Sequence, residues 1–479
     1  MRRDLLRLQG AEHDVLVVGG GIHGAAAAWD AAQRGLRVAL VEAADFGAGA
    51  SWNSLKTIHG GLRHLQRADL PGLRESVRER RAFLHIAPEL ARPLPFLLPL
   101  RGHGLRGRAA VTAALLAFDL LSRDRNRGLP ASHHIPRGRI LGRAALAARV
   151  PGLEAAHAAL WHDAQVESSE RLVMGFLHAA AGAGAVVANA VEVAGVLRDG
   201  ARVSGARVRD AETGEAFDVR ARLVIAAAGA AAGAVASLAG ISLDGPPLLE
   251  AMNLVLGRPV VTGTAVGGEA EGRLLFLVPW NGRAIVGTEY AGPGNAGPGW
   301  VPAFLARARK AFPWADLREG DVALVHRGRV PGHGEHALIT RHRVIDHRRA
   351  HGVPGLVSIV SAKFTTARAA AEEAVDLAFA QLGRPLVRSR TAVTALPAAR
   401  PLAGDLAAQA RSAARDEMAL HLDDALRRRL GLGAAGPPST ADVETVAAAL
   451  AAELGWSPER LHAEKAAFAR HLAPPVPPA

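Results

Sequence analysis

Cysteine is absent from the 479 residues of this sequence. Disulfide bonds, thiolate catalysis, cysteine-ligated zinc and iron–sulfur clusters are therefore excluded, and we predict no metal site. Aromatic residues are scarce, at 4% of the chain. Because they do not alternate with the basic clusters, the sequence lacks the stacking surfaces typical of nucleic-acid binding, and we expect no nucleic-acid partner.

No uninterrupted hydrophobic run approaches the roughly 18 residues that identify a membrane-spanning helix. The chain starts with the basic stretch MRRDLLRLQG, but no apolar stretch with a small-residue cleavage site follows it, so an export signal is not indicated. These absences favour a cytoplasmic protein, either soluble or peripheral on the inner face of the cell membrane.

Acidic residues are outnumbered by basic ones, 45 against 57, which gives a formal net charge of +12. A generally basic surface is the simplest interpretation, and an acidic membrane surface or an anionic substrate stays open as a partner. Residues 100–128 are an apolar, helix-forming segment bracketed by arginines. Such a helix could lie on a bilayer. Its charges cluster at the ends without forming a polar stripe, which favours a helix packed inside the protein.

The most informative segment is residues 13–42, HDVLVVGGGIHGAAAAWDAAQRGLRVALVE. An apolar run leads into a glycine turn, an alanine-rich helix follows, and a second apolar run ends at Glu42. This order predicts a strand–helix–strand unit that binds a dinucleotide. The alternative is a glycine-rich turn in an ordinary sheet protein.

The glycine spacing explains how such a turn would work. Gly19 permits a tight turn, Gly21 lets backbone N–H groups approach a pyrophosphate, and Gly24 allows the helix to pack closely on the strand. The helix N-terminus faces the phosphates with its partial positive charge. Glu42 closes the second strand, where a carboxylate can accept hydrogen bonds from the ribose hydroxyls.

The rest of the chain predicts an α/β protein of three parts. A helix over residues 169–182 precedes a strand over 186–193, and a pattern of period two then indicates antiparallel strands with turns at Asp199-Gly200 and Thr213-Gly214. A hairpin turning at Asn281-Gly282 follows. We expect a nucleotide domain assembled from residues 12–70, 160–235 and 335–388. An inserted antiparallel-sheet substrate domain takes residues 71–159 and 236–334, and a C-terminal helical domain takes residues 398–472.

Five further segments carry a family resemblance: the unit over residues 13–42 is followed by SLKTIHGGLRHLQ, HDAQVESSERLV, ALITRHRVIDH, SAKFTTAR and a helical tail. Together they resemble the FAD-dependent glycerol-3-phosphate dehydrogenases and oxidases, within the D-amino-acid-oxidase-like flavoproteins. The resemblance spans nearly the whole chain. It implies FAD instead of NAD, held by a Rossmann-like domain of the glutathione-reductase and D-amino-acid-oxidase type.

The resemblance also implies a reaction. The substrate would be sn-glycerol 3-phosphate or a related small anion, oxidised to dihydroxyacetone phosphate by hydride transfer from C2 to the flavin N5. A membrane quinone would accept the electrons, with oxygen as the other acceptor left open. A homodimer is also left open.

The predicted site residues follow from the matching motifs. Catalytic positions are Arg63, Arg341, Lys363 and His59, and cofactor-binding positions are Gly19, Gly20, Gly21, Ile22, His23, Gly24, Glu42, Ser51, Ser54, Lys56, Thr57, Val191, Gly229 and Lys363. A dianionic phosphate needs cationic partners, and arginine offers a bidentate fork. For each arginine alone, a surface ion pair is the alternative. The residues His59, His64 and His326 are candidates for the base that accepts the hydroxyl proton.

The chain departs from the family pattern at the substrate side. The family motif Gly-Val-Arg-Pro reads Gly-Arg-Val-Pro over residues 328–331, and a shift by one residue turns Arg329 to the opposite face of a strand. Asn253 stands where relatives carry a histidine, residues 227–231 read AAGAA, and residues 361–363 read SAK. Cofactor binding rests mostly on backbone amides and is expected to survive these changes.

Two other functions therefore stay open. One is an oxidase or dehydrogenase of amino acids, amines or 2-hydroxy acids, in which Arg341 binds a carboxylate. The other is a flavin-bound or basic nucleic-acid-binding protein without turnover.

Overall fold

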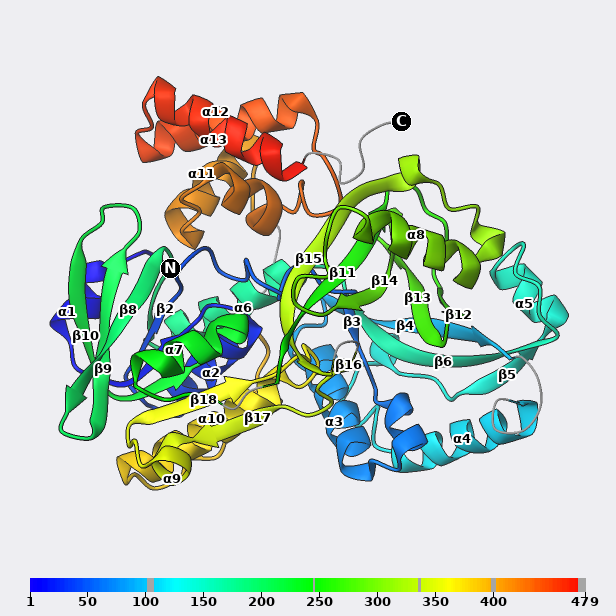
Figure 1. Cartoon of the computed structure of the whole chain (residues 1–479), viewed down its shortest axis with the longest axis horizontal. Helices are drawn as coiled ribbons and strands as arrows, with labels where there is room; N and C mark the ends of the chain where they lie inside the picture. Colours follow the sequence, from blue (N-terminus) through cyan, green and yellow to red (C-terminus); the bar gives the residue numbers. More distant parts are fainter. Residues whose placement is uncertain (101–106, 244–245, 335–336, 398–401, 473–479) are drawn as a thin grey trace.

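The computed structural model describes residues 1–100, 107–243, 246–334, 337–397 and 402–472. Figure 1 shows three parts: a parallel-sheet domain, an antiparallel-sheet domain beside it, and a group of C-terminal helices above the parallel-sheet domain. Two expected domain segments start at residues outside these ranges, residues 335 and 398. Part of the apolar segment 100–128 also lies outside them.

The first sheet is centred on β1 (His13–Val18), whose six residues are all buried. β1 pairs in parallel with β2 and with β10, with Val17 opposite Leu40 and Ile225. This sheet has the order β17 (Arg343–Asp346), β18 (Leu356–Val360), β10 (Ala216–Ala226), β1, β2 (Val38–Val41), β7 (Val186–Ala188). Only β17 runs antiparallel to its neighbour along this order.

Both faces of this sheet are covered, which explains the continuous apolar strands. Val15 and Val17 pack against α2 (Ile22–Gln33), α6 (Ser169–Gly182) and α10 (Ala367–Leu382). Leu16 and Val18, which point to the other face, pack under α1 (Leu5–Gly10), α7 (Ala232–Leu238) and a β-meander.

The meander consists of β8 (Val191–Asp199), β9 (Arg202–Asp210) and the first half of β10, and both predicted turns are present in it. The strand predicted over residues 186–193 is two strands, because the chain turns at Ala190, whose φ is +51°.

The second sheet is mostly antiparallel and includes the predicted hairpin at Asn281-Gly282. Its order is β16 (Ala337–Leu338), β15 (Val322–His333), β11 (Leu248–Leu256), β14 (Arg283–Ala291), β13 (Arg273–Trp280), β12 (Ala265–Ala270), β4 (Ala91–Pro99), β6 (His157–Val166), β3 (Thr57–Ile58), with β5 (Arg139–Gly142) also on β6. The expected domain boundary at residue 160 falls inside β6. Strand pairing places this boundary after Val166, and it also assigns β3 to the second sheet.

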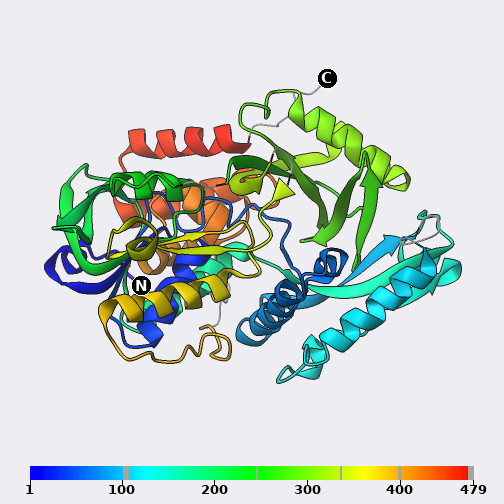
Figure 2. The ribbon, with the colours of Figure 1, turned by 60° about the horizontal axis from the view of Figure 1, so that its bottom comes forward.

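Four longer helices flank the second sheet: α3 (Leu70–Ile86), α4 (Arg108–Leu121), α5 (Arg143–Arg149) and α8 (Trp300–Ala311). Of these, α4 accounts for the apolar segment flanked by arginines, and Figure 2 shows it in cyan along the outer side of the sheet. Its Leu115 and Phe118 are buried, whereas Leu116 and Leu120 are 64% and 69% exposed. The helix is therefore packed on one side only. No helix in the described ranges is long and apolar enough to cross a membrane.

The C-terminal part contains α11 (Leu406–Glu417), the π-helical segment η7 (Asp424–Arg429), α12 (Thr440–Leu454) and α13 (Pro458–Leu472). Ser439 caps α12, since its hydroxyl accepts a hydrogen bond from the Asp442 N–H at 3.1 Å.

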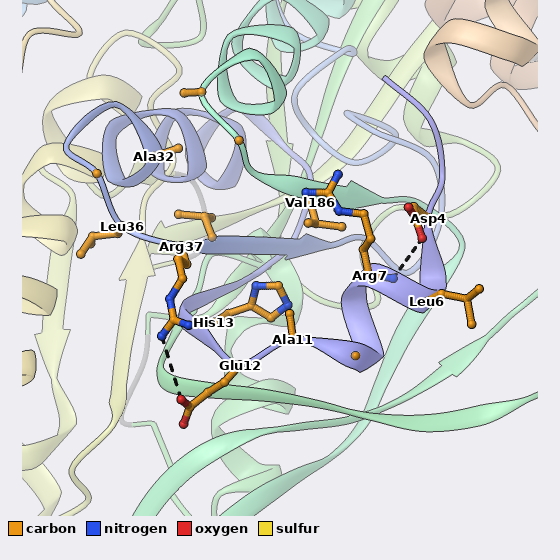
Figure 3. A pocket seen from close by; sticks show the side chains of 15 residues that line it. Asp4, Leu6, Arg7, Ala11, Glu12, His13, Ala32, Leu36, Arg37 and Val186 are labelled. Atoms are coloured by element: carbon orange, nitrogen blue, oxygen red, sulfur yellow. Dashed lines mark hydrogen bonds and ion pairs between the residues drawn. The ribbon is translucent and has the colours of Figure 1, made fainter.

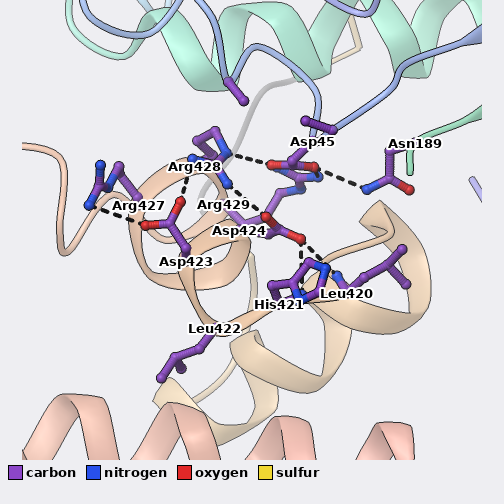
Figure 4. A network of polar contacts seen from close by, with 12 residues as sticks. Asp45, Asn189, Leu420, His421, Leu422, Asp423, Asp424, Arg427, Arg428 and Arg429 are labelled. Atoms are coloured by element: carbon purple, nitrogen blue, oxygen red, sulfur yellow. Dashed lines mark hydrogen bonds and ion pairs between the residues drawn. The ribbon is translucent and has the colours of Figure 1, made fainter. Parts of the chain in front are cut away.

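A buried ion network fastens these helices to the loop that follows Glu42 (Figure 4). Asp45 Oδ2 accepts from Arg428 Nε at 2.6 Å, and Asp45 Oδ1 accepts from Arg429 Nη2 at 2.6 Å and from Asn189 Nδ2 at 3.1 Å. Burial alone would raise the pKa of Asp45, but the two guanidinium groups outweigh it and lower this pKa to about 2. The carboxylate therefore stays ionised.

At the edge of the same network, His421 joins the C-terminal helices to the meander. Its Nδ1 lies 2.8 Å from Glu464 Oε1 and its Nε2 lies 3.1 Å from Glu212 Oε1. The hydrogen bond to Glu464 raises the pKa of His421 to about 9.

We expect His421→Gln to destabilise the protein by about 1 kcal/mol below pH 6.5, discounted for the partial exposure of the ring. Because the folded-state pKa lies above the unfolded one, this stabilisation is complete below pH 6.5 and disappears as the pH rises through 9. Urea unfolding at pH 6 and pH 10 measures both limits. The exposed His462→Gln on α13 is the matched control, and an equal loss at both pH values would contradict the assignment.

Candidate active site

The turn between β1 and α2 leaves no room for a side chain at three glycine positions. Gly19 has a φ of +110°, and a Cβ there would lie 2.7 Å from the Ala227 carbonyl oxygen at the end of β10. A Cβ on Gly24 would lie 1.8 Å from the Gly19 carbonyl oxygen. A Cβ on Gly20 would also collide with Phe46, at 2.6 Å. The helix can therefore approach the strand only when these positions lack side chains.

The turn leaves backbone N–H groups available at the start of α2. Gly21 is the N-cap residue and provides no side-chain cap, so the first-turn amides need partners from outside the helix. The Ile22 N–H donates to Ser51 Oγ at 3.0 Å, which places the loop after β2 over this helix end. Backbone N–H groups at a helix N-terminus can donate hydrogen bonds to the oxygens of a pyrophosphate.

Glu42 lies at the carboxyl end of β2 as predicted. Its Oε2 accepts from the Gly20 N–H at 2.6 Å and its Oε1 from the Ala44 N–H at 2.9 Å. Burial raises the pKa of Glu42. The Val191 N–H donates to the Glu42 carbonyl at 2.8 Å, and Gly229 begins the short helix η4 (Gly229–Ala231) after β10, with a φ of +56°. These residues converge at one edge of the sheet.

Two buried polar atoms near this edge have no hydrogen-bond partner among the described residues: His23 Nε2 and Thr366 Oγ1. His23 is in the first turn of α2, where burial, and secondarily His342, lowers its pKa to about 4. Thr366 is the N-cap residue of α10. An unsatisfied buried polar group costs about 1–3 kcal/mol. Together with the glycine turn, these atoms fit a bound dinucleotide such as FAD. Thr366 was not among the predicted positions, although the SAKFTTAR motif contains it.

The loop before β3 uses several of its predicted cofactor-binding side chains internally. Lys56 is fully buried, and its Nζ contacts Glu170 Oε1 at 2.7 Å and Ser169 Oγ at 2.9 Å. Burial lowers the pKa of Lys56. Ser54 Oγ accepts from the Lys56 N–H at 3.3 Å, and Thr57 Oγ1 donates to the Leu55 carbonyl at 3.1 Å. The Lys56 ammonium therefore ties this loop to the start of α6.

Three predicted residues from distant segments meet through one chain of contacts. Lys363 Nζ lies 3.0 Å from His64 Nε2, and His64 Nδ1 lies 2.8 Å from Asp69 Oδ2. Arg341 donates to the other oxygen of Asp69. Burial lowers the pKa of Lys363, and the hydrogen bond from Arg341 holds the pKa of Asp69 well below its usual range.

His59 occupies a different position, beside this chain. The backbone N–H of His59 donates to Thr365 Oγ1 at 3.1 Å. This hydrogen bond attaches His59 to the turn that carries Lys363. Its Nδ1 lies 3.2 Å from Asp163 Oδ2 of β6. Although burial raises the pKa of Asp163, hydrogen bonds and charges from His59, Arg80 and the Gly60 N–H produce a net lowering. The ring of His59 is 51% exposed, so this carboxylate orients an accessible imidazole.

The other two histidine candidates are more enclosed. His64 lies between Asp69 and Lys363, and burial lowers its pKa. His326 is fully buried under the C-terminal helices, with Nε2 3.0 Å from the Ala434 carbonyl. Burial lowers the pKa of His326 to about 3. Among the three, only His59 combines a carboxylate partner with a half-exposed ring.

Arg63 is exposed, and its charge acts on Tyr290 of β14. Burial raises the pKa of Tyr290, the single tyrosine of the chain, while Thr288 and the guanidinium groups of Arg273 and Arg63 oppose this effect. Sequence reasoning missed both residues: no quoted motif contains Tyr290, whereas Asp163 is the second residue of HDAQVESSERLV.

The structure explains two departures from the family pattern. A Cβ on Gly328 would lie 2.8 Å from Asn53 Oδ1. The face of β15 on which that Cβ would lie is therefore turned to the loop that contains Ser51 and Asn53. By strand alternation Val330 shares that face, while Arg329 points the other way and is exposed. The guanidinium is therefore turned away, as the one-residue shift predicts. Asn253 Oδ1 accepts from Thr288 Oγ1 at 2.7 Å, within the second sheet.

A hollow of about 740 Å³ lies at the other end of the first sheet, where β1, β2 and β7 begin (Figure 3). In its lining, the backbone N–H of Arg7 donates to Asp4 Oδ1 at 3.0 Å, and the guanidinium of Arg37 lies 4.0 Å from Glu12 and 3.2 Å from Asp14. Because dinucleotides bind at the carboxyl ends of parallel strands, this hollow is separate from the candidate site.

Comparison with known proteins identifies the class. Residues 14–377 match the family described as FAD dependent oxidoreductase, and residues 365–461 match the one described as C-terminal domain of alpha-glycerophosphate oxidase. The chain belongs to the FAD dependent oxidoreductase family. This membership confirms the predicted resemblance, the fold class and the predicted cofactor.

Individual relatives agree with this assignment. A glycerol-3-phosphate dehydrogenase of Synechocystis sp. is 31% identical over 421 residues, covering 83% of this chain and 75% of that protein. One of Mycobacterium leprae is 29% identical over 521 residues, covering 95% and 87%. The structure of the glycerol-3-phosphate dehydrogenase from Bacillus halodurans complexed with FAD has a TM-score of 0.74 at 20% identity, covering 98% of this chain and 96% of that one.

We expect Gly24→Ala to yield a protein that is purified without flavin and unfolds at a lower temperature. The new Cβ would require the Gly19 carbonyl to move, which opens the turn that faces the pyrophosphate, and overpacking of this kind costs about 1–3 kcal/mol. Flavin absorbance per chain and thermal unfolding measure both effects. Gly49→Ala is the matched control, because a Cβ there meets nothing within 4 Å. A Gly24→Ala protein with full flavin content would refute this role.

Proposed function

We propose that this protein is an FAD-dependent glycerol-3-phosphate dehydrogenase, which oxidises sn-glycerol 3-phosphate to dihydroxyacetone phosphate. The observation that carries the proposal is the convergence of Lys363 and Arg341 on one contact chain beside the His59–Asp163 pair. A cationic group next to an oriented imidazole suits a substrate that has both a phosphate and an alcohol to be oxidised. The relatives named glycerol-3-phosphate dehydrogenase support the same substrate.

Each residue has a distinct task in this proposal. When bound, FAD supplies the hydride acceptor. His59 accepts the proton of the substrate hydroxyl at Nε2, because Asp163 holds Nδ1. Arg341 and Arg63 bind the phosphate, and Lys363 stabilises negative charge that develops near the flavin ring.

The second candidate is an oxidase or dehydrogenase of amino acids, amines or 2-hydroxy acids. Glycine oxidase from Geobacillus kaustophilus shares the fold, with a TM-score of 0.52 at 22% identity, covering 80% of this chain and 98% of that one. Val330 stands where the family motif has an arginine, so the proposed substrate site has one cation fewer. This difference favours the second candidate. The whole-chain match to glycerol-3-phosphate dehydrogenases favours the first.

We also propose that the protein functions in glycerol metabolism, in the cytoplasm and peripherally on the inner membrane face, and transfers its electrons to a membrane quinone. Exposed Leu116 and Leu120 on α4 and the net charge of +12 support contact with an anionic bilayer. Oxygen is the competing acceptor, and comparison of quinone analogues with oxygen as oxidants of the reduced flavin separates the two.

Anaerobic addition of glycerol 3-phosphate to the purified holoprotein should bleach the visible flavin band within the observation time of a stopped-flow experiment. Glycine, sarcosine, D-alanine and lactate should leave the band unchanged over the same period. Reduction by one of these compounds, and none by glycerol 3-phosphate, would replace the first candidate by the second.

Replacing Arg341 by glutamine should raise KM for glycerol 3-phosphate about 10- to 100-fold, because a charge-assisted hydrogen bond contributes about 1.5–3 kcal/mol. The kcat value should change much less, since a contact with the phosphate stabilises the bound substrate and the transition state equally. Steady-state kinetics with an artificial dye as acceptor measures both constants. Arg343→Gln, an exposed change on the neighbouring strand β17, is the control, and equal KM values for the two variants would remove Arg341 from the phosphate site.

A further inference from the structure

A second basic site lies in the antiparallel-sheet domain, where β5, β6 and the end of α5 meet. A hollow of about 460 Å³ is lined there by Pro136, Arg137, Gly138, Arg139, Arg149, Leu160 and His162, and we name it the Arg149 hollow. His162 neighbours Asp163 in sequence. Because side chains alternate along a strand, it faces away from the His59–Asp163 pair. The hollow is therefore distinct from the candidate active site.

The three arginines of the Arg149 hollow have no carboxylate partner in the described part of the chain. Nearby arginines are paired: Arg80 lies 2.9 Å from Asp163, and Arg125 lies 3.1 Å from Asp119. The lack of a counter-charge is therefore a property of the hollow and not of the region. Guanidinium groups grouped around one space repel one another, and an anion in that space removes the repulsion.

His162 adds a second, independent observation. Its Nδ1 is buried and has no hydrogen-bond partner among the described residues. Burial, followed by the charges of Arg149, Arg80 and Arg139, lowers the pKa of His162 to about 4, so the ring is neutral at physiological pH. A neutral imidazole can donate one hydrogen bond to a ligand oxygen. An unsatisfied buried atom of this kind costs about 1–3 kcal/mol unless a ligand or a water satisfies it.

We propose that the Arg149 hollow binds the phosphate group of a small molecule or of a lipid. Planar guanidinium groups recognise phosphate oxygens through paired hydrogen bonds, and the space exceeds the roughly 30 Å³ of a water molecule many times over. The ligand class is therefore a phosphate ion, monoester or diester.

The surroundings connect the hollow with two parts of the molecule. The Gly138 N–H donates to Asp119 Oδ2 of α4 at 3.2 Å, so the lining loop is attached to the helix that exposes Leu116 and Leu120. A phospholipid headgroup in the hollow would thus lie beside an apolar helix face. On the inner side, Arg80 Nη1 donates to the His162 carbonyl at 2.7 Å and to Asp163 Oδ1 at 2.9 Å, next to the active-site pair.

The test compares the full-length holoprotein with Arg139→Gln/Arg149→Gln, and with Arg123→Gln/Arg143→Gln as a control of equal charge. All four arginines are exposed, and the control pair lies outside the hollow. Inorganic phosphate is titrated calorimetrically. The wild type and the control should bind it at two sites, and the hollow variant should weaken one of them at least tenfold. Arg341→Gln, which changes the candidate active site, should weaken the other.

A second assay identifies the source of the phosphate. Co-sedimentation with phosphatidylglycerol vesicles, and with phosphatidylcholine vesicles as reference, is measured for the same variants. Loss of phosphate binding by the hollow variant supports a soluble ligand, and loss of phosphatidylglycerol binding alone supports a headgroup. Equal behaviour of the hollow and control variants in both assays overturns the proposal. Unchanged flavin content verifies folding, and the readouts do not depend on the substrate that reduces the flavin.

Discussion

The whole arrangement depends on the close approach of α2 to β1. Gly24 lies so near the Gly19 carbonyl that any side chain would separate helix from strand, and Gly19 in turn lies against the end of β10. The helix N-terminus is thereby fixed at the point where three parallel strands end. That point determines where Glu42, the loop containing Ser51 and the buried Nε2 atom of His23 lie. A flavin-binding edge results from backbone geometry more than from any charged side chain.

β6 has a similar organising role on the substrate side. It pairs with β3 in the second sheet, and its Asp163 contacts His59, the residue that follows β3. The backbone N–H of His59 donates to Thr365, in the turn that carries Lys363. The proposed substrate position is therefore where the two sheets meet, with the carboxylate of Asp163 on β6 and the cation of Lys363 in the turn after β18. The alternation of side chains along the strand also separates this site from the Arg149 hollow, although Asp163 and His162 are adjacent in sequence.

Local patterns explain what could be predicted from the sequence. The unit over residues 13–42, the helix over 169–182 and the hairpin at Asn281-Gly282 depend on glycine positions and periodicity that lie within short segments. The membership of β3 and β6 in the second sheet depends on pairing between distant segments, and no local pattern encodes it. The same reason explains why Asp163 and Tyr290 were missed, and why burial of the Lys56 ammonium against Glu170 was not foreseen.

The salt bridges between Asp45 and the pair Arg428 and Arg429 join positions 383 and 384 residues apart. During translation, the loop beyond Glu42 is thus complete long before its anchors leave the ribosome. An incomplete chain has the glycine turn but lacks the contacts that hold this loop down. The loop beyond Glu42 is consequently anchored late in biosynthesis, after the residues of η7 have been made.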